Sequence, residues 1–192
     1  DIQEVKRVPY HDEIKWIVGN KKRNDFIVNL CCKIEGNILL LFNYVDSHGI
    51  PLYESIKNTC VDKKVFLIHG GTEIEQRENI RRIVNAILVA SYGTCSTGIN
   101  IKNIHNVIFS SPSKSVVRVL QSLGRGLRKS KTKDSVKLYD ISDNLQHKKY
   151  INHTMRHFAD RIKIYTKEKF SFNIIKIRIW LDRRKNRNEN II

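Results

Sequence analysis

Residues 121–128, with the sequence Gln-Ser-Leu-Gly-Arg-Gly-Leu-Arg, hold the side chains best suited to chemistry in this chain. Arg125 and Arg128 are three residues apart and would share one face of a helix. The guanidinium group is planar and permanently charged, so such a pair can neutralise charge that develops on the terminal phosphate of a nucleotide. Gly124 and Gly126 would let a neighbouring domain approach the backbone closely. The alternative is an ordinary helix end, where arginine complements the helix dipole.

Two further polar segments follow apolar runs that we expect to be strands. Residues 91–100 are rich in serine, threonine and glycine, and their hydroxyl and backbone N–H groups are suitable donors to a phosphate chain. A turn without any ligand would have the same composition. His69 and Gly70 follow another apolar run, and Arg77 comes shortly afterwards in an expected helix.

The elements between these segments are typical of a parallel α/β sheet. Five short runs are apolar on both faces, as buried parallel strands are. They are residues 37–42, 64–69, 86–91, 106–111 and 136–141. Helical patterns occupy residues 25–34, 47–59, 72–84 and 113–127. The alternation predicts a doubly wound, mainly parallel sheet of about five to six strands with helices on both faces. Ligands of such sheets gather beyond the carboxyl ends of the strands, where the polar segments would lie.

We expect this α/β domain to occupy residues 25–142. Residues 1–24 are predicted to be a linker from a preceding domain, with a strand around 2–8 and a helix around 11–18. Residues 143–192 are predicted to form a basic helical hairpin, because apolar residues recur at helical spacing in two stripes. The first stripe is Ile151, Met155, Phe158, Ile162 and Tyr165, and the second is Phe170, Ile174, Ile177 and Leu181.

The hairpin carries thirteen Lys and Arg against five Asp and Glu, a net charge of +8. Its candidate phosphate contacts are Lys167, Lys169, Lys176, Arg183, Arg184 and Lys185. A solvated helical face is the alternative, and the apolar stripes could instead pack on the α/β domain or mediate self-association.

The whole chain has 35 Lys and Arg against 19 Asp and Glu, a net charge of +16. This surplus favours a polyanionic partner, usually nucleic acid, although it also promotes solubility. With 41% hydrophobic and 28% charged residues in 192, the composition indicates a globular protein rather than a disordered one. No apolar run approaches the roughly 20 residues that span a bilayer. The chain does not begin with a secretion signal, so we expect a cytoplasmic protein without a membrane partner.

The four cysteines show no metal-ligand spacing, and no metal site is predicted. Cys31 and Cys32 are adjacent and would point to different faces of a helix. We expect all four cysteines to be reduced and mostly buried.

In their order and spacing, these segments resemble the second RecA-like domain of superfamily 2 helicases. Residues 39–42 are similar to motif IV, 69–77 to the nucleic-acid-contact segment that follows it, 91–100 to motif V and 121–128 to motif VI. The sequence of residues 90–100 is most similar to that of phage recombination helicases. Asn100 stands where the family often has Asp, and Ser122 where Arg or His is frequent.

The resemblance implies roles for individual residues. Arg125 and Arg128 would reach the terminal phosphate of ATP, and Gln121 would position them. Gly98, Asn100 and Gly124 would contact the nucleotide, with Asn100 near the ribose. The expected nucleic-acid contacts of this domain are His69, Gly70, Arg77, Ser91 and Thr94.

The sequence contains neither a G-x-x-x-x-G-K-[ST] phosphate loop nor a DE-x-[DH] box for magnesium. We therefore expect ATP and Mg²⁺ to be held mainly by an N-terminal motor domain of the same protein, and these 192 residues alone to be inactive. The resemblance implies an ATP-dependent DNA helicase in recombination, repair and replication. It would regress forks, migrate junctions and unwind RNA–DNA hybrids without sequence preference. An ATP-independent nucleic-acid-binding module and half of an RNA helicase remain alternatives.

Overall fold

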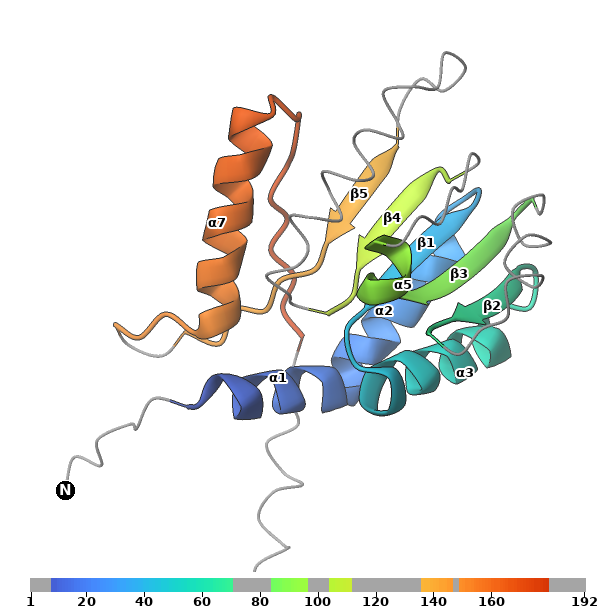
Figure 1. Cartoon of the computed structure of the whole chain (residues 1–192), viewed down its shortest axis with the longest axis horizontal. Coiled ribbons are helices and arrows are strands. Elements are labelled where there is room, and N and C mark those ends of the chain that lie inside the picture. Colours follow the sequence, from blue (N-terminus) through green and yellow to red (C-terminus); the bar gives the residue numbers. More distant parts are fainter. Residues whose placement is uncertain (1–7, 71–83, 97–103, 112–135, 147–148, 180–192) are drawn as a thin grey trace, which may run out of the picture.

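The computed structural model describes residues 8–70, 84–96, 104–111, 136–146 and 149–179, apart from the side chains of Cys95 and Ser96. Its centre is a sheet of five parallel strands in the order β2-β3-β1-β4-β5 (Figure 1). The strands are β1 (Ile38–Phe42), β2 (Lys64–Ile68), β3 (Ala86–Ser91), β4 (Asn106–Phe109) and β5 (Lys137–Asp140). All five lie within the predicted apolar runs, so the predicted parallel sheet is confirmed.

The central strand β1 explains why the runs are apolar throughout. All five of its residues are buried. Ile38, Leu40 and Phe42 belong to the core cluster on one face, whereas Leu39 and Leu41 belong to the cluster on the other. A strand covered on both faces has no polar side, because successive side chains alternate between the faces.

Helices lie on both faces of the sheet, as predicted (Figure 1). Helices α2 (Lys21–Lys33) and α3 (Ile50–Thr59) cover one face, and the short α5 (Tyr92–Ser96) lies on the other. The π-helix η1 (Val45–Gly49) precedes α3 and packs against the end of β1. A Cβ atom at Gly49 would come within 2.5 Å of the Phe42 ring, so only glycine permits this packing. The helices predicted at 72–84 and 113–127, and the strand at 2–8, lie outside the described residues or almost entirely so.

Two further helices lie near the two ends of the chain and contact each other. Helix α1 (Tyr10–Gly19) confirms the helix predicted near the N-terminus, and α7 (His153–Lys167) confirms the first helix of the hairpin. The buried Glu13 carboxylate of α1 accepts hydrogen bonds from the backbone N–H groups of His153, at 2.9 Å, and Thr154, at 2.8 Å. These N–H groups have no partner within their own helix, so α1 supplies the cap of α7.

The second helix of the predicted hairpin is wrong for residues 170–179, which form neither helix nor strand and run back beside α7 (Figure 1). Helix α7 ends because Lys169 adopts a left-handed backbone conformation, with φ of 57°. The N–H of Lys169 then donates to the Thr166 carbonyl at 3.1 Å, and the N–H of Phe170 donates to the Tyr165 carbonyl at 2.9 Å. This pattern is a Schellman motif, normally built on glycine. A lysine gave no sequence signal for it.

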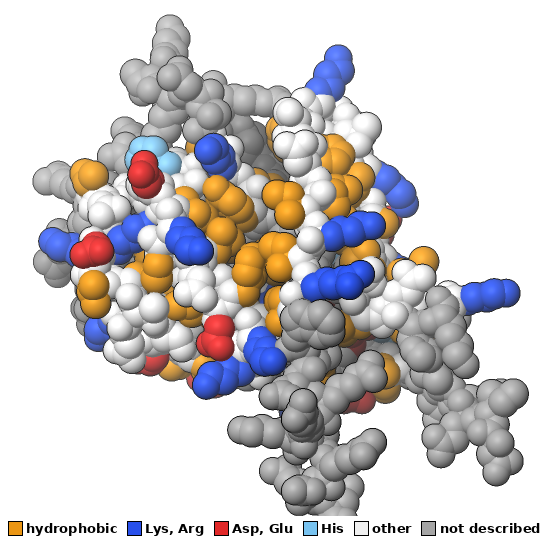
Figure 2. All heavy atoms as spheres, turned by 180° about the vertical axis from the view of Figure 1, so that it is seen from behind, with side chains coloured by type: hydrophobic (Ala, Val, Ile, Leu, Met, Phe, Trp, Pro, Cys, Tyr) orange, Lys and Arg blue, Asp and Glu red, His pale blue; other side chains and the backbone are white. Residues whose placement is uncertain are grey.

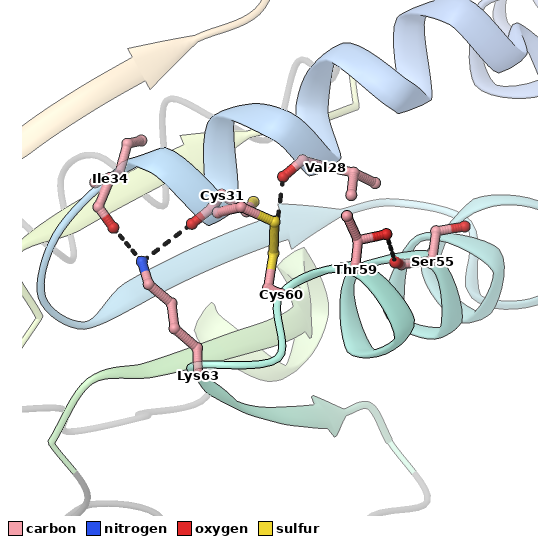
Figure 3. The surroundings of a disulfide bond; sticks show 8 residues. Val28, Cys31, Ile34, Ser55, Thr59, Cys60 and Lys63 are labelled. Carbon is pink, nitrogen blue, oxygen red and sulfur yellow. Dashed lines mark hydrogen bonds between the residues drawn. A yellow bond between two sulfur atoms is a disulfide. The ribbon is translucent and has the colours of Figure 1, made fainter.

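The expectation of four reduced cysteines is also wrong. Cys32, near the end of α2, and Cys60, just after α3, form a disulfide with a Cα–Cα distance of 5.1 Å (Figure 3). Packing of α2 against α3 brings together residues that are 28 positions apart. Cys31 is buried and free, and the Lys63 ammonium donates to the carbonyl groups of Cys31 and Ile34 beside the disulfide.

Two features are absent from the described residues. None of their helices is both long and apolar enough to cross a bilayer. These residues also contain no group of three or more His, Cys, Asp or Glu side chains placed to hold a metal ion.

Candidate site at the carboxyl edge of the sheet

The carboxyl ends of the strands form one edge. Phe42 of β1 pairs with Ser91 of β3, and Phe109 of β4 pairs with Asp140 of β5. Ile68 of β2 lies beside Ala90, one residue before the end of β3. The segments that leave β2 and β3 are therefore close to the same edge, where open α/β sheets bind their ligands.

Ser91 and Thr94 form a local pair at this edge. Their hydroxyl oxygens are 2.8 Å apart, and the N–H of Thr94 donates to the Ser91 hydroxyl at 3.2 Å. Thr94 is buried, whereas Ser91 is partly exposed. Of the two predicted nucleic-acid contacts, Ser91 is thus the more accessible, and Thr94 orients its hydroxyl.

His69 and Gly70 leave the neighbouring strand β2. His69 is half-buried and Gly70 is exposed. Among the described residues, no atom lies within 4 Å of a Cβ built at Gly70.

A buried polar network lies next to this edge, and its central residue is Ser111, two residues after the end of β4. The Ser111 hydroxyl accepts from the N–H of Asn43 at 3.2 Å and lies 2.8 Å from Nδ1 of His48. The Ser111 carbonyl accepts from the Tyr92 hydroxyl at 2.9 Å. One serine therefore ties together the ends of β1, β3 and β4.

His48 is neutral in this network. Burial, and to a smaller extent the charge of Arg23, lower its pKa to about 3. Asn24 donates its amide N–H to the Val18 carbonyl at 2.8 Å, which turns its carbonyl oxygen toward Nε2 of His48, 3.2 Å away. Nε2 therefore carries the proton, and Nδ1 accepts from the Ser111 hydroxyl.

An ion pair attaches α7 to the end of β5. Arg161 donates to the two carboxylate oxygens of Asp140 at 2.7 and 2.9 Å and to the Ser142 hydroxyl at 2.6 Å. The Tyr165 hydroxyl donates to the same carboxylate at 2.8 Å. Burial raises the pKa of the Tyr165 phenol, and the charge of Asp140 raises it further, so Tyr165 remains a donor. The Arg161 side chain is only 3% exposed, so it serves structure and not a DNA surface.

Sequence reasoning missed these structural residues. His48 and Ser111 are 63 positions apart, and Glu13 and Thr154 are 141 apart, so no local pattern connects them. Nothing in the sequence distinguishes Arg161 from the other basic residues of the extension.

The predicted site residues are only partly placed. Lys167, Lys169 and Lys176 are exposed, as expected for phosphate contacts. The predictions for Arg77, Gly98, Asn100, Gln121, Gly124, Arg125, Arg128, Arg183, Arg184 and Lys185 lie outside the described residues.

Known proteins resemble both the sequence and the fold. The ATP-dependent DNA helicase UvsW of Enterobacteria phage T4 is 36% identical over 186 residues, which cover 88% of this chain and 36% of that protein. The crystal structure of T4 UvsW matches with a TM-score of 0.70 at 35% identity, over 85% of this chain and 36% of that one. The C-terminal part of the Fun30 ATPase domain is less similar, at 16% identity and a TM-score of 0.49. The chain spans about a third of the length of UvsW.

The sheet order, the helices on both faces and the T4 UvsW match together show the RecA-like fold of a helicase C-terminal domain. The family model of the helicase conserved C-terminal domain matches residues 21–130, which include all of β1 to β4. This chain belongs to the helicase conserved C-terminal domain family.

Proposed function

We propose that this chain is the C-terminal half of an ATP-dependent DNA helicase or translocase. ATP and Mg²⁺ would be held mainly by an N-terminal motor domain of the same protein. Closure of the two domains would bring Arg125 and Arg128 to the terminal phosphate, with Gln121 positioning them. The guanidinium groups would stabilise charge in the transition state of hydrolysis.

The observation that carries the proposal is the family match over residues 21–130, which contains every segment expected to contact the nucleotide. Gly98, Asn100 and Gly124 lie within this match and would contact ATP. The described part of the fold is compatible with that use, because the strands that lead toward these segments end together at one edge.

Nucleic acid would bind along the same edge. Ser91 and Gly70 are accessible there, and His69, Arg77 and Thr94 belong to the same two segments. Contacts of hydroxyl, backbone and arginine groups with phosphates are independent of base sequence, as a translocase requires. The exposed Lys167, Lys169 and Lys176 would add phosphate contacts, together with Arg183, Arg184 and Lys185.

The relation to UvsW favours DNA as the substrate, because that relative is described as a DNA helicase. We propose branched DNA in recombination, repair and replication: regression of forks, migration of junctions and unwinding of RNA–DNA hybrids.

The test is Arg125→Ala in the full-length protein. We expect the DNA-stimulated ATPase rate to fall on the order of 10³-fold, as when an arginine finger is removed. DNA affinity without nucleotide should stay within about twofold, because the finger contacts ATP. The matched control is Arg156→Ala, which removes an exposed guanidinium group on α7 that stacks over Tyr150. Unchanged turnover in Arg125→Ala would refute the motor function.

A further inference from the structure

The chain exposes an unusual apolar surface after α7. Five large apolar side chains of the 170–179 segment are exposed. Their exposed fractions are 42% for Phe170, 42% for Phe172, 58% for Ile174, 79% for Ile175 and 55% for Ile177. Several exposed large apolar side chains within one short segment commonly mark a binding site.

The backbone of the segment is also available. Phe170 completes the Schellman motif, but residues 171–179 make no backbone hydrogen bond with the part of the chain that the structure describes. The apolar side chains are thus presented on a backbone that is not committed to a sheet.

The two phenylalanine rings are held in place by one tyrosine. The Tyr165 ring lies 6.3 Å from that of Phe170 and 6.0 Å from that of Phe172, between ring centroids. Tyr165 is itself fixed by its hydrogen bond to Asp140. Both phenylalanine side chains are nevertheless 42% exposed. Each ring therefore packs on one side and remains partly open, which is the arrangement of an aromatic stacking surface.

Positive charges flank the rings on both sides. Lys167 and Lys169 precede them, and Lys176 and Arg178 follow, whereas Glu168 is the only acidic residue from 167 to 179. None of these four cations makes an ion pair within the described part of the chain. Figure 2 shows Lys and Arg side chains interleaved with apolar ones on the side of the molecule where α7 and the segment lie.

We propose that Phe170 and Phe172, together with the four flanking cations of residues 167–178, form a binding site for single-stranded nucleic acid, in which bases stack on the two rings and phosphates lie at the cations. Every base has a π-face, so such stacking tolerates all sequences. The charge decides between partners, because a net surplus of three cations in twelve residues complements a polyanion. The inference rests on the proposed function, since such a site would let a helicase bind the strand that it has separated.

The test measures binding of a fluorescent thymidine oligonucleotide of about twenty bases to the full-length protein without nucleotide. Phe172→Leu keeps an apolar side chain on Tyr165 but removes the ring, and we expect affinity to fall about tenfold. Phe172→Trp retains stacking and should bind within about twofold of the wild type. The control is Ile175→Ala, which removes the most exposed isoleucine of the segment and should leave affinity unchanged. The salt dependence of binding should be the same in Phe172→Leu, because no phosphate contact is lost.

A second measurement does not depend on a variant that folds. Photocrosslinking of an iodouridine oligonucleotide to the wild-type protein should place crosslinks at Phe170 or Phe172. Wild-type affinity in Phe172→Leu, or crosslinks only at other residues, would overturn the site. An equal loss in Ile175→Ala would overturn it too, since that result describes a general apolar surface for a protein partner.

The two proposals fail separately. If Arg125→Ala abolishes the ATPase while Phe172→Leu binds normally, the motor function stands without this site. If Arg125→Ala leaves turnover unchanged, the motor function fails, and the oligonucleotide data still decide the stacking site.

Discussion

Reduction of the Cys32–Cys60 disulfide should lower the stability of the domain by several kcal/mol. The bond joins residues 28 positions apart. A cross-link around a loop of that length lowers the conformational entropy of the unfolded chain, which stabilises the folded state by about 3.6 kcal/mol at 25 °C. For a domain of this size, each kcal/mol changes Tm by about 2–4 °C, so reduction should lower Tm by about 7–14 °C. The closed loop contains β1 and His48, which lie beneath the candidate site.

Thermal melting followed by circular dichroism, with and without a thiol reductant, measures this difference. Alkylation and mass spectrometry on the same samples count the free thiols. A Cys32→Ser and Cys60→Ser double variant is the control, and its Tm should be low and insensitive to the reductant. The description of this packing would be refuted if untreated protein carried both thiols free. It would also be refuted if complete reduction left the melting temperature unchanged.

Two further predictions concern Glu13 of α1 and the exposed lysines between residues 167 and 176. Burial alone would raise the pKa of Glu13, but hydrogen bonds from Asn152, Thr154 and His153 outweigh it and hold the pKa below the ordinary value. The contribution of Glu13 to the free energy of unfolding should therefore be fully present above about pH 4.5 and lost as the pH falls through the lower pKa of the folded state. Urea unfolding between pH 3 and 6 should show this loss in the wild type but not in Glu13→Gln. The control Asp12→Asn, at an exposed residue, should show the same loss as the wild type. Neutralising Lys167, Lys169 and Lys176 to Gln should reduce the slope of log affinity against log salt for single-stranded DNA by about 2. The same change at the exposed Lys21, Lys22 and Lys33 of α2 should reduce it less, and equal slopes in the two variants would remove the phosphate role of the first three.

The sheet could be predicted because its signals are local. A strand buried on both faces is apolar at every position, and Ile38–Phe42 shows this over its whole length. The apolar spacing of α2 likewise predicted a helix. The helix begins earlier than expected, at Lys21, because the Asn20 side chain accepts a hydrogen bond from the N–H of Arg23 and caps it. The sequence predicted a helix to begin at residue 25, because the first turn of α2 is polar.

The errors arose where contacts between distant residues decide the structure. The spacing of Phe170, Ile174 and Ile177 fits a helix, but the left-handed conformation of Lys169 reverses the chain before one can start. The residues that position the candidate site could not be predicted from the sequence for a related reason. A buried His48 or Glu13 has no distinctive neighbours in sequence, and only the fold brings its partners to it.

Three buried contacts also determine how the basic extension can be tested. Arg161 binds Asp140 at the end of β5, Arg23 of α2 binds Asp143 at 2.7 Å, and Glu13 caps α7. Removing residues 143–192 would take away the partners of Glu13, Arg23 and Asp140, and loss of one partner of a buried ion pair costs about 3–5 kcal/mol. Weaker DNA binding by such a truncated protein would therefore reflect unfolding as readily as lost phosphate contacts. Substitution of the exposed lysines leaves all three contacts in place, so it separates the electrostatic role of the extension from its structural one.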